Sequence, residues 1–153
     1  MLPVLLLRFQ AVLAALWFGL VLILALMVAP MLFAMLERPL AGQVAGALFR
    51  IEAYAALGVA VALFLIERRQ ANMRAVWGRS SRFSIELGLI LAALFCTIFG
   101  YFGLQPMMEE ARAGQGSFSF GLLHGVSSAF FAVKGLILVV LTWRLITRLG
   151  RRG

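Results

Sequence analysis

Four long apolar runs alternate with short polar segments along this chain. A helix crosses the hydrocarbon core of a bilayer with about 20 residues, and each run reaches that length. We therefore predict membrane-spanning helices at residues 9–36, 40–66, 83–104 and 118–143. Pro30 predicts a tolerable kink in the first span, and Gln105-Pro106 predicts the end of the third. The connections are an arginine-rich loop at 67–82 and two others at 37–39 and 105–117.

The composition supports lipid as the natural solvent of this chain. Of its 153 residues, 63% are hydrophobic and 13% are charged, whereas soluble domains are about 45–50% apolar and about 25% charged. No linker divides the chain, so residues 1–153 are expected to form one all-α, integral membrane four-helix bundle. The apolar run after Arg8 is too long for a cleavable signal peptide, so it is expected to remain as a helix.

The basic residues predict the orientation of the spans. Cytoplasmic segments of membrane proteins are enriched in Lys and Arg. Arg38 and Arg112 flank the spans on one side. Ten arginines flank the other side: Arg8, Arg68, Arg69, Arg74, Arg79, Arg82, Arg144, Arg148, Arg151 and Arg152. We predict a multi-pass inner (cytoplasmic) membrane protein with both termini in the cytoplasm and with Trp77 and Trp143 at that interface. The net charge of +8 then favours anionic lipids, rather than nucleic acid, as partners.

Ionisable residues lie inside the second, third and fourth spans. They are Arg50, Glu52, Glu86, His124 and Lys134. Each such group costs at least about 2.5–3.5 kcal/mol at bilayer depth, so it usually faces protein or water and has a partner. Arg50 and Glu52 are two residues apart and point to nearly opposite sides of their helix. We predict an interhelical Glu52–Lys134 pair, with Glu86 as the alternative partner if Lys134 extends toward the cytoplasmic end.

The polar residues of the fourth span share one face. At 100° per residue, His124, Ser127, Phe131 and Lys134 fall within an arc of roughly 80°, and Ser128 adjoins it. Two interpretations follow. The first is a site for an ion, a proton or a small polar ligand between the second and fourth spans, formed by Arg50, Glu52, His124, Ser127, Ser128 and Lys134, with Glu86 nearby. The second is a structural ion-pair network that fixes helix register.

Small residues predict how these two spans pack. Gly42 and Gly46 are four residues apart in the second span, as are Gly121 and Gly125 in the fourth. Such spacing allows helix backbones to approach closely. We therefore expect direct contact between the second and fourth spans.

A second group of residues carries soft ligand atoms. Its members are Met27, Met31, Met35, Cys96, Met107, Met108 and His124. Thioether, thiol and imidazole groups suit metals such as Cu(I), but Met and Cys are also ordinary packing residues, and packing is the favoured interpretation. A single His excludes a bis-histidine haem within one chain. No cofactor is predicted, although haem or copper is kept open. Catalysis is not favoured, because there is no close carboxylate pair and no Cys-His spacing.

Several short motifs resemble the family of small four-helix membrane proteins named for human transmembrane protein 205, whose bacterial members are a domain of unknown function. The motifs are Trp17-Phe18-Gly19, Pro30-Met31-Leu32-Phe33, Gly42-Gln43-Val44, Leu48-Phe49, Gln105-Pro106 and Leu123-His124-Gly125-Val126-Ser127-Ser128. The resemblance implies a four-helix fold and importance of His124, Ser127 and Ser128. The namesake is linked to resistance to platinum drugs, which implies export or trafficking.

A more distant likeness is to the four-helix protoporphyrinogen oxidase and copper-resistance D families. These families place a His before the aromatic-Gly element of the first helix, where this chain has Phe9-Gln10. This difference argues against haem. The leading hypothesis is a transporter or resistance protein for an ion or a small polar or soft-metal solute. The alternatives are an accessory subunit of a larger membrane complex, a homodimer included, and a haem- or copper-linked protein.

Overall fold

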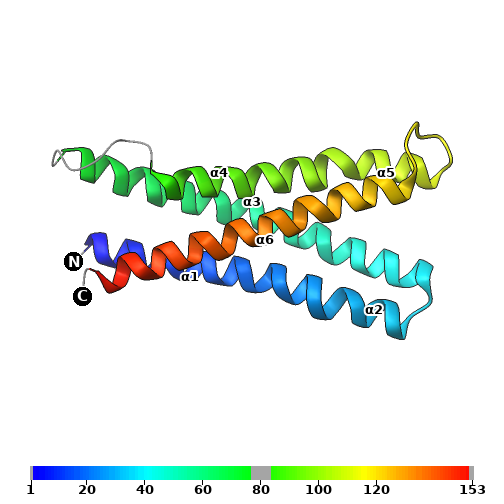
Figure 1. Ribbon diagram of the computed structural model, residues 1–153, viewed down its shortest axis with the longest axis horizontal. Helices are drawn as coiled ribbons and strands as arrows, with labels where there is room; N and C mark the ends of the chain where they lie inside the picture. Colours follow the sequence, from blue (N-terminus) through cyan, green and yellow to red (C-terminus); the bar gives the residue numbers. More distant parts are fainter. Residues whose placement is uncertain (1, 77–83, 152–153) are drawn as a thin grey trace.

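The protein folds as four long helical segments that run alternately up and down, as the computed structural model shows (Figure 1). The structure describes residues 2–76 and 84–151. Along the chain its elements are α1 (Leu2–Ile23), the π-helical turn η1 (Leu24–Val28), α2 (Ala29–Met35), α3 (Arg38–Val76), α4 (Ile85–Thr97), the π-helical turn η2 (Ile98–Gly103), α5 (Leu104–Arg112) and α6 (Phe120–Gly150). Each of the four segments within this part is long and apolar enough to cross a membrane.

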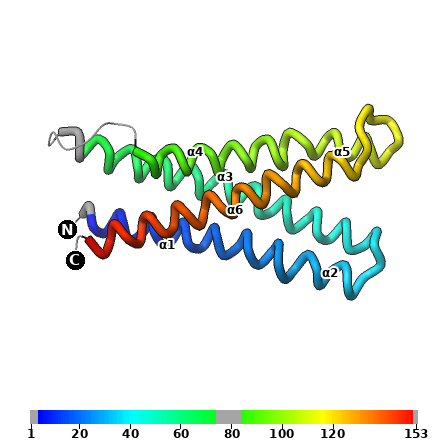
Figure 2. The backbone as a smooth tube through the Cα atoms, in the orientation of Figure 1, coloured from blue at the N-terminus to red at the C-terminus, as the bar shows by residue number. Residues whose placement is uncertain are grey.

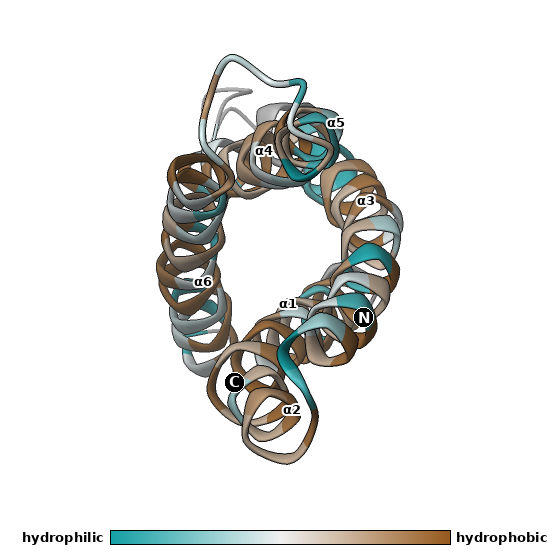
Figure 3. Ribbon diagram, turned by 90° about the vertical axis from the view of Figure 1, so that its right-hand side faces the viewer, coloured by the Kyte–Doolittle hydropathy of each residue, from teal (hydrophilic) through white to brown (hydrophobic). Residues whose placement is uncertain are grey.

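The four segments form a ring around a common axis (Figure 3). Helix α1 packs against α3 and α6, and α4 also packs against α3 and α6. The second and fourth spans, α3 and α6, are therefore not adjacent in the ring. They face each other diagonally across its axis. The prediction that these two spans pack side by side is therefore wrong. Hydropathy marks which residues enter the membrane, but it carries no information about which helices are adjacent.

The two ends of the bundle differ. The start of α1 and the end of α6 lie together at one end, called here the terminal end (Figures 1 and 2). At the other, the loop end, α2 and the start of α3 diverge from α5 and the start of α6. The main hydrophobic core fills the half of the bundle near the termini. Its members include Leu7, Ala11, Ala14, Trp17, Ala56, Ala60, Leu63, Ile90, Ala93, Leu138, Leu141 and Leu145. The many alanines let the backbones approach, and in lipid this close packing provides much of the driving force for association.

The helices extend beyond the apolar runs that predicted them. Helix α1 begins before Arg8, and α3 continues through much of the loop expected at 67–82 to Val76. Helix α5 occupies much of the loop expected at 105–117, and α6 continues past residue 143. The extensions in α3 and α5 are rich in Arg, Glu, Gln, Met and Ala, which are good helix formers. Hydropathy locates the apolar layer and misses helical turns on either side of it. Trp77, Arg79, Arg82 and Arg152 lie outside the described residues.

Neither Pro30, predicted to kink the first span, nor Pro106, predicted to end the third, interrupts its helical segment. Pro30 lies in the first turn of α2, directly after η1, and Pro106 lies in the first turn of α5, directly after η2. A proline removes a backbone donor, and local π-helical adjustments accommodate such defects in membrane helices. The predicted end of the third span at Gln105-Pro106 is therefore wrong, since α5 runs on to Arg112. Ala113 caps the end of this helix, and the next residue, Gly114, has a φ of 73°, which favours glycine.

The glycine motifs do not mediate close packing. A Cβ built on Gly42, Gly46, Gly121 or Gly125 would meet no neighbouring atom within 4 Å. The closest glycine contact is instead at Gly100 in η2, where a Cβ would lie 2.5 Å from Phe130 Cβ of α6. The close backbone approach of α3 and α6 predicted from these motifs is therefore wrong, and the close approach is between the third and fourth spans.

Candidate functional site

A vestibule of about 950 Å³ occupies the half of the bundle near the loop end. All four helical segments contribute to its wall, and Figure 3 looks along the ring from this end. Arg38 and Pro39 of α3 and Arg112 of α5 line it at the loop end, called here its mouth, while Glu52 and Lys134 line it at the opposite, inner end. The volume lies within the range of about 300–1,000 Å³ that is typical of small-molecule sites.

Glu52 and Lys134 form the ion pair that the sequence predicts. The Lys134 Nζ atom lies 2.9 Å from Glu52 Oε1 and 2.8 Å from Oε2, and both side chains are almost fully buried. The Trp17 Nε1 atom donates a third hydrogen bond to Glu52 Oε1 at 3.3 Å. The pair links the diagonal helices α3 and α6 across the bundle axis. It lies between the vestibule and the apolar core of the terminal half.

Aromatic rings surround the vestibule side of this pair. The Phe131 ring centroid lies 4.4 Å from Lys134 Nζ, a cation–π contact. The same ring packs edge-on against Phe49, with centroids 5.1 Å apart. Both phenylalanines line the vestibule. These two rings therefore lie beside the ion pair on the side toward the loop end.

The polar stripe on the fourth span faces the vestibule, as its periodicity predicted. His124, Ser127 and Ser128 all line it, together with Phe131. The Ser127 hydroxyl donates a hydrogen bond to the carbonyl oxygen of Gly100 in η2. Ser127 therefore has a structural partner, because a π-helical turn disturbs the regular hydrogen bonds of its helix. Ser128 and His124 remain exposed to the vestibule.

An aromatic stack lies near the mouth. The His124 and Phe120 rings are nearly parallel, with centroids 5.7 Å apart. The Arg112 guanidinium carbon lies 4.6 Å from the centroid of the same Phe120 ring. Phe120 thus joins a cationic side chain of α5 to the imidazole of α6, and this arrangement orients both groups beside the opening.

Two residues assigned to the site lie elsewhere. Arg50 is exposed on α3 and does not line the vestibule, since it lies on nearly the opposite side of the helix from Glu52. Glu86 is fully buried at the terminal end, where it accepts a hydrogen bond from Arg144 Nε at 2.8 Å and another from Arg148. The alternative pairing of Glu86 with Lys134 is therefore wrong, because two arginines of α6 are closer.

A second polar cluster at the terminal end was not anticipated. Gln10 donates to Glu67 at 3.0 Å, Gln70 donates to Gln10 at 2.8 Å, and Ser84 donates to Glu67 at 2.7 Å. Arg148 Nη1 lies 3.7 Å from the Glu67 carboxylate. Together with Glu86 and Arg144, these residues link all four helical segments, and we call them the terminal cluster.

The terminal cluster could have been found from helical spacing. Gln10 lies seven residues before Trp17 and so falls on the same face of its helix. Glu67 and Gln70 fall within roughly 60° of Glu52 around α3. Assigning Glu67 to a loop concealed this relation, and the uncharged Gln10 was counted as part of an apolar run.

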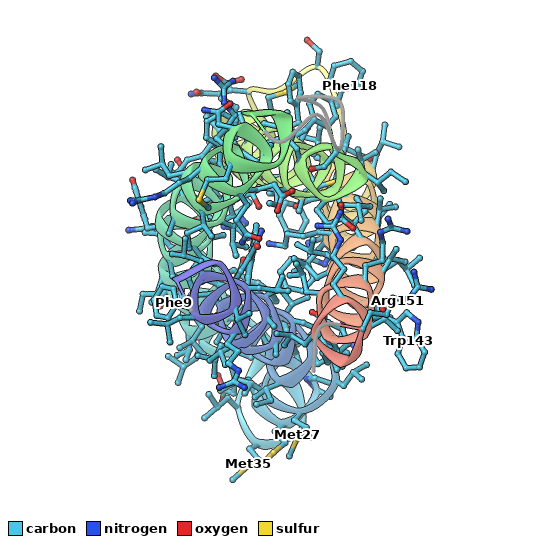
Figure 4. The ribbon with its side chains drawn as sticks, turned by 90° about the vertical axis from the view of Figure 1, so that its left-hand side faces the viewer. Phe9, Met27, Met35, Phe118, Trp143 and Arg151 are labelled. Atoms are coloured by element: carbon cyan, nitrogen blue, oxygen red, sulfur yellow. The ribbon has the colours of Figure 1, made fainter. Side chains whose placement is uncertain are left out.

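The soft-ligand residues do not gather in one place. Met27, Met31 and Met35 are more than half exposed, and the labelled Met27 and Met35 point away from the bundle (Figure 4). Cys96, Met108 and His124 line the vestibule instead. Phe9 and Trp143 also point outward, as lipid-facing residues should (Figure 4). Within residues 2–76 and 84–151, no group of three or more His, Cys, Asp or Glu side chains could hold a metal ion.

Comparison with known proteins places the chain in a family. The model of the family described as Domain of unknown function (DUF4149) matches residues 12–117, more than half of the chain. The chain belongs to this family. The match includes Trp17, Glu52 and Cys96 and ends before α6, which supplies Lys134 and His124. Searches of curated proteins and of solved structures found no match.

Proposed function

We propose that this protein is a membrane carrier that binds a small solute in the vestibule and releases it at the terminal end. The observation that carries the proposal is the buried Glu52–Lys134 pair at the inner end of a solute-sized vestibule. A pair that only fixed helix register would have no need of an open approach. Intramembrane charges that face a cavity commonly mark solute or ion pathways.

The terminal half supplies the barrier that a carrier needs. On the terminal side of the Glu52–Lys134 pair, apolar residues such as Ala60 and Leu63 of α3 are fully buried. The terminal cluster lies still closer to the terminal end and joins all four segments. When two helices separate, water can replace the partner of each charged group in an interhelical ion pair. Opening of this half, with closure of the loop end, would give a solute access to the opposite side.

We infer the orientation from the arginines. Their excess near the terminal end favours an inner-membrane protein with both termini in the cytoplasm, and the vestibule would then open to the outer side. Anionic lipids at the cytoplasmic face are then the natural neighbours of these arginines. The resemblance to the transmembrane protein 205 family, with its link to drug resistance, agrees with a carrier role.

Thiol accessibility tests the proposal without knowledge of the solute. Cys96 is the single cysteine of the chain, so Cys96→Ser provides a background for Ala60→Cys. A membrane-impermeant methanethiosulfonate applied from the terminal side should label this cysteine slowly, because the barrier opens transiently. Val61→Cys is the matched control, since Val61 is 53% exposed on the lipid-facing side of α3. Complete protection of Ala60→Cys in the folded protein would contradict a carrier mechanism.

Arg50 favours one alternative, an accessory subunit or homodimer. This arginine is exposed on α3 within the spanning region, where an unpartnered charge costs at least about 2.5–3.5 kcal/mol. A carboxylate or backbone carbonyl of a neighbouring subunit would offset that cost. Arg50→Gln should then dissociate a complex that the unaltered protein forms in native gels of gently solubilised membranes. A monomer in both samples would exclude this alternative.

A further inference from the structure

The vestibule carries a net positive charge. The charged side chains in its described lining are Arg38, Arg112, Lys134 and Glu52. Glu52 and Lys134 neutralise each other in their direct pair, so Arg38 and Arg112 remain. Glu37, Glu109 and Glu110 lie at the same end, but they are exposed and do not line the vestibule. Arg38 and Arg112 are also exposed, so what distinguishes them from the three glutamates is that the arginines line the chamber.

The two arginines approach the mouth from different helices. Arg38 begins α3, and Arg112 ends α5. A guanidinium group presents a planar set of donors that fits carboxylate, sulfonate or phosphate oxygens in pairs. The amide side chain of Gln43 lines the same chamber and adds further donors, while that of Gln105, also in the lining, donates to Glu109 at 3.3 Å.

The deeper wall is apolar and aromatic. Phe33, Phe49 and Phe131 line it, and the ion pair beyond them is already satisfied by its own contacts. A fully hydrated inorganic ion would gain little from such a wall. An aromatic or aliphatic body would displace water from it, which is favourable.

Resting on the proposed carrier function, we propose that the vestibule binds amphipathic organic anions. The anionic group contacts Arg38 and Arg112 at the mouth, and the apolar body lies against Phe33, Phe49 and Phe131. The same chemistry occurs in soluble aromatic or aliphatic acids and in anionic phospholipids, so the experiment must separate these two sources.

Equilibrium dialysis of the full-length protein in phosphatidylcholine nanodiscs tests this inference. The probes are 2-naphthoate and 2-naphthylmethylammonium, which share an aromatic body and differ in the sign of charge. Empty nanodiscs correct for partitioning into lipid. Naphthoate should bind saturably and about tenfold more tightly than the ammonium, the scale expected of charge-assisted hydrogen bonds. Equal or tighter binding of the ammonium would overturn the inference, as would the absence of saturable binding.

Variants locate the binding. The double variant Arg38→Gln/Arg112→Gln should weaken naphthoate binding about tenfold. Arg8→Gln, the same change on an exposed arginine at the terminal end, should leave it unchanged. Unchanged binding in the double variant would also overturn the inference. Because Ala60→Cys labelling does not depend on the solute, failure here and failure of the carrier proposal are distinguishable.

Native mass spectrometry shows whether the bound anion is a phospholipid or a soluble acid. Nanodiscs that contain phosphatidylglycerol and phosphatidylcholine supply both lipids. Selective retention of phosphatidylglycerol by the unaltered protein, lost in Arg38→Gln/Arg112→Gln, supports the inference with a lipid as the anion. Saturable naphthoate binding without such retention supports it with a soluble anion.

Discussion

Removal of either partner of the Glu52–Lys134 pair leaves an uncompensated charge in the centre of the bundle. Nζ lies within 2.9 Å of both carboxylate oxygens, and the two side chains are 3% and 2% exposed. Loss of one partner of such a pair costs about 3–5 kcal/mol. Glu52→Gln should fall near the lower end of this range, because its amide oxygen can still accept from Lys134 and Trp17. Lys134→Met should fall near the upper end.

The double variant should recover most of this loss. Glu52→Gln/Lys134→Met is neutral and similar in volume, and replacement of a whole buried pair is often nearly neutral. We expect it to lose only about 1–2 kcal/mol, so that the single variants couple by about 3 kcal/mol or more. Reversible unfolding in mixed micelles, followed by circular dichroism, gives the four free energies. Losses that simply add, or single-variant losses below about 1 kcal/mol, would refute the assignment of a desolvated ion pair.

Two further predictions concern packing and the barrier. Gly100→Ala should lower the free energy of unfolding by about 1–3 kcal/mol, because its Cβ would lie 2.5 Å from Phe130 Cβ, whereas Gly121→Ala should not destabilise; equal effects in the same unfolding assay would argue against the close α6–η2 contact. Arg148→Gln should weaken the terminal cluster and so speed the labelling of Ala60→Cys from the terminal side, and an unchanged rate would show that the cluster does not hold the barrier closed.

The sequence was sufficient to locate the four apolar segments, but not the ends of their helices, and to identify the central pair. Four apolar runs locate the four segments because bilayer thickness sets a minimum length for each. Glu52 and Lys134 could be paired because a buried charge needs a partner and few were available. The stripe from His124 to Lys134 was visible because a helix repeats every 3.6 residues.

Features that depend on three-dimensional arrangement were not accessible. The order of helices around the ring follows from side-chain fit, so the diagonal placement of α3 and α6 had no signal in hydropathy. Gly42 and Gly121 resemble a packing motif, but a missing Cβ brings helices together only when another helix faces it. The bond from Ser127 to Gly100 depends on η2, which hydropathy does not reveal.

The most direct test of the account is whether water reaches the vestibule from the loop end. Ser128 faces the vestibule, while Val126, two residues away on α6, is exposed but does not line it. Each can be replaced by cysteine in the Cys96→Ser background. A membrane-impermeant methanethiosulfonate applied from the loop side should label Ser128→Cys rapidly and Val126→Cys hardly at all. Equal protection of both positions would contradict an open vestibule, and with it the carrier that we propose.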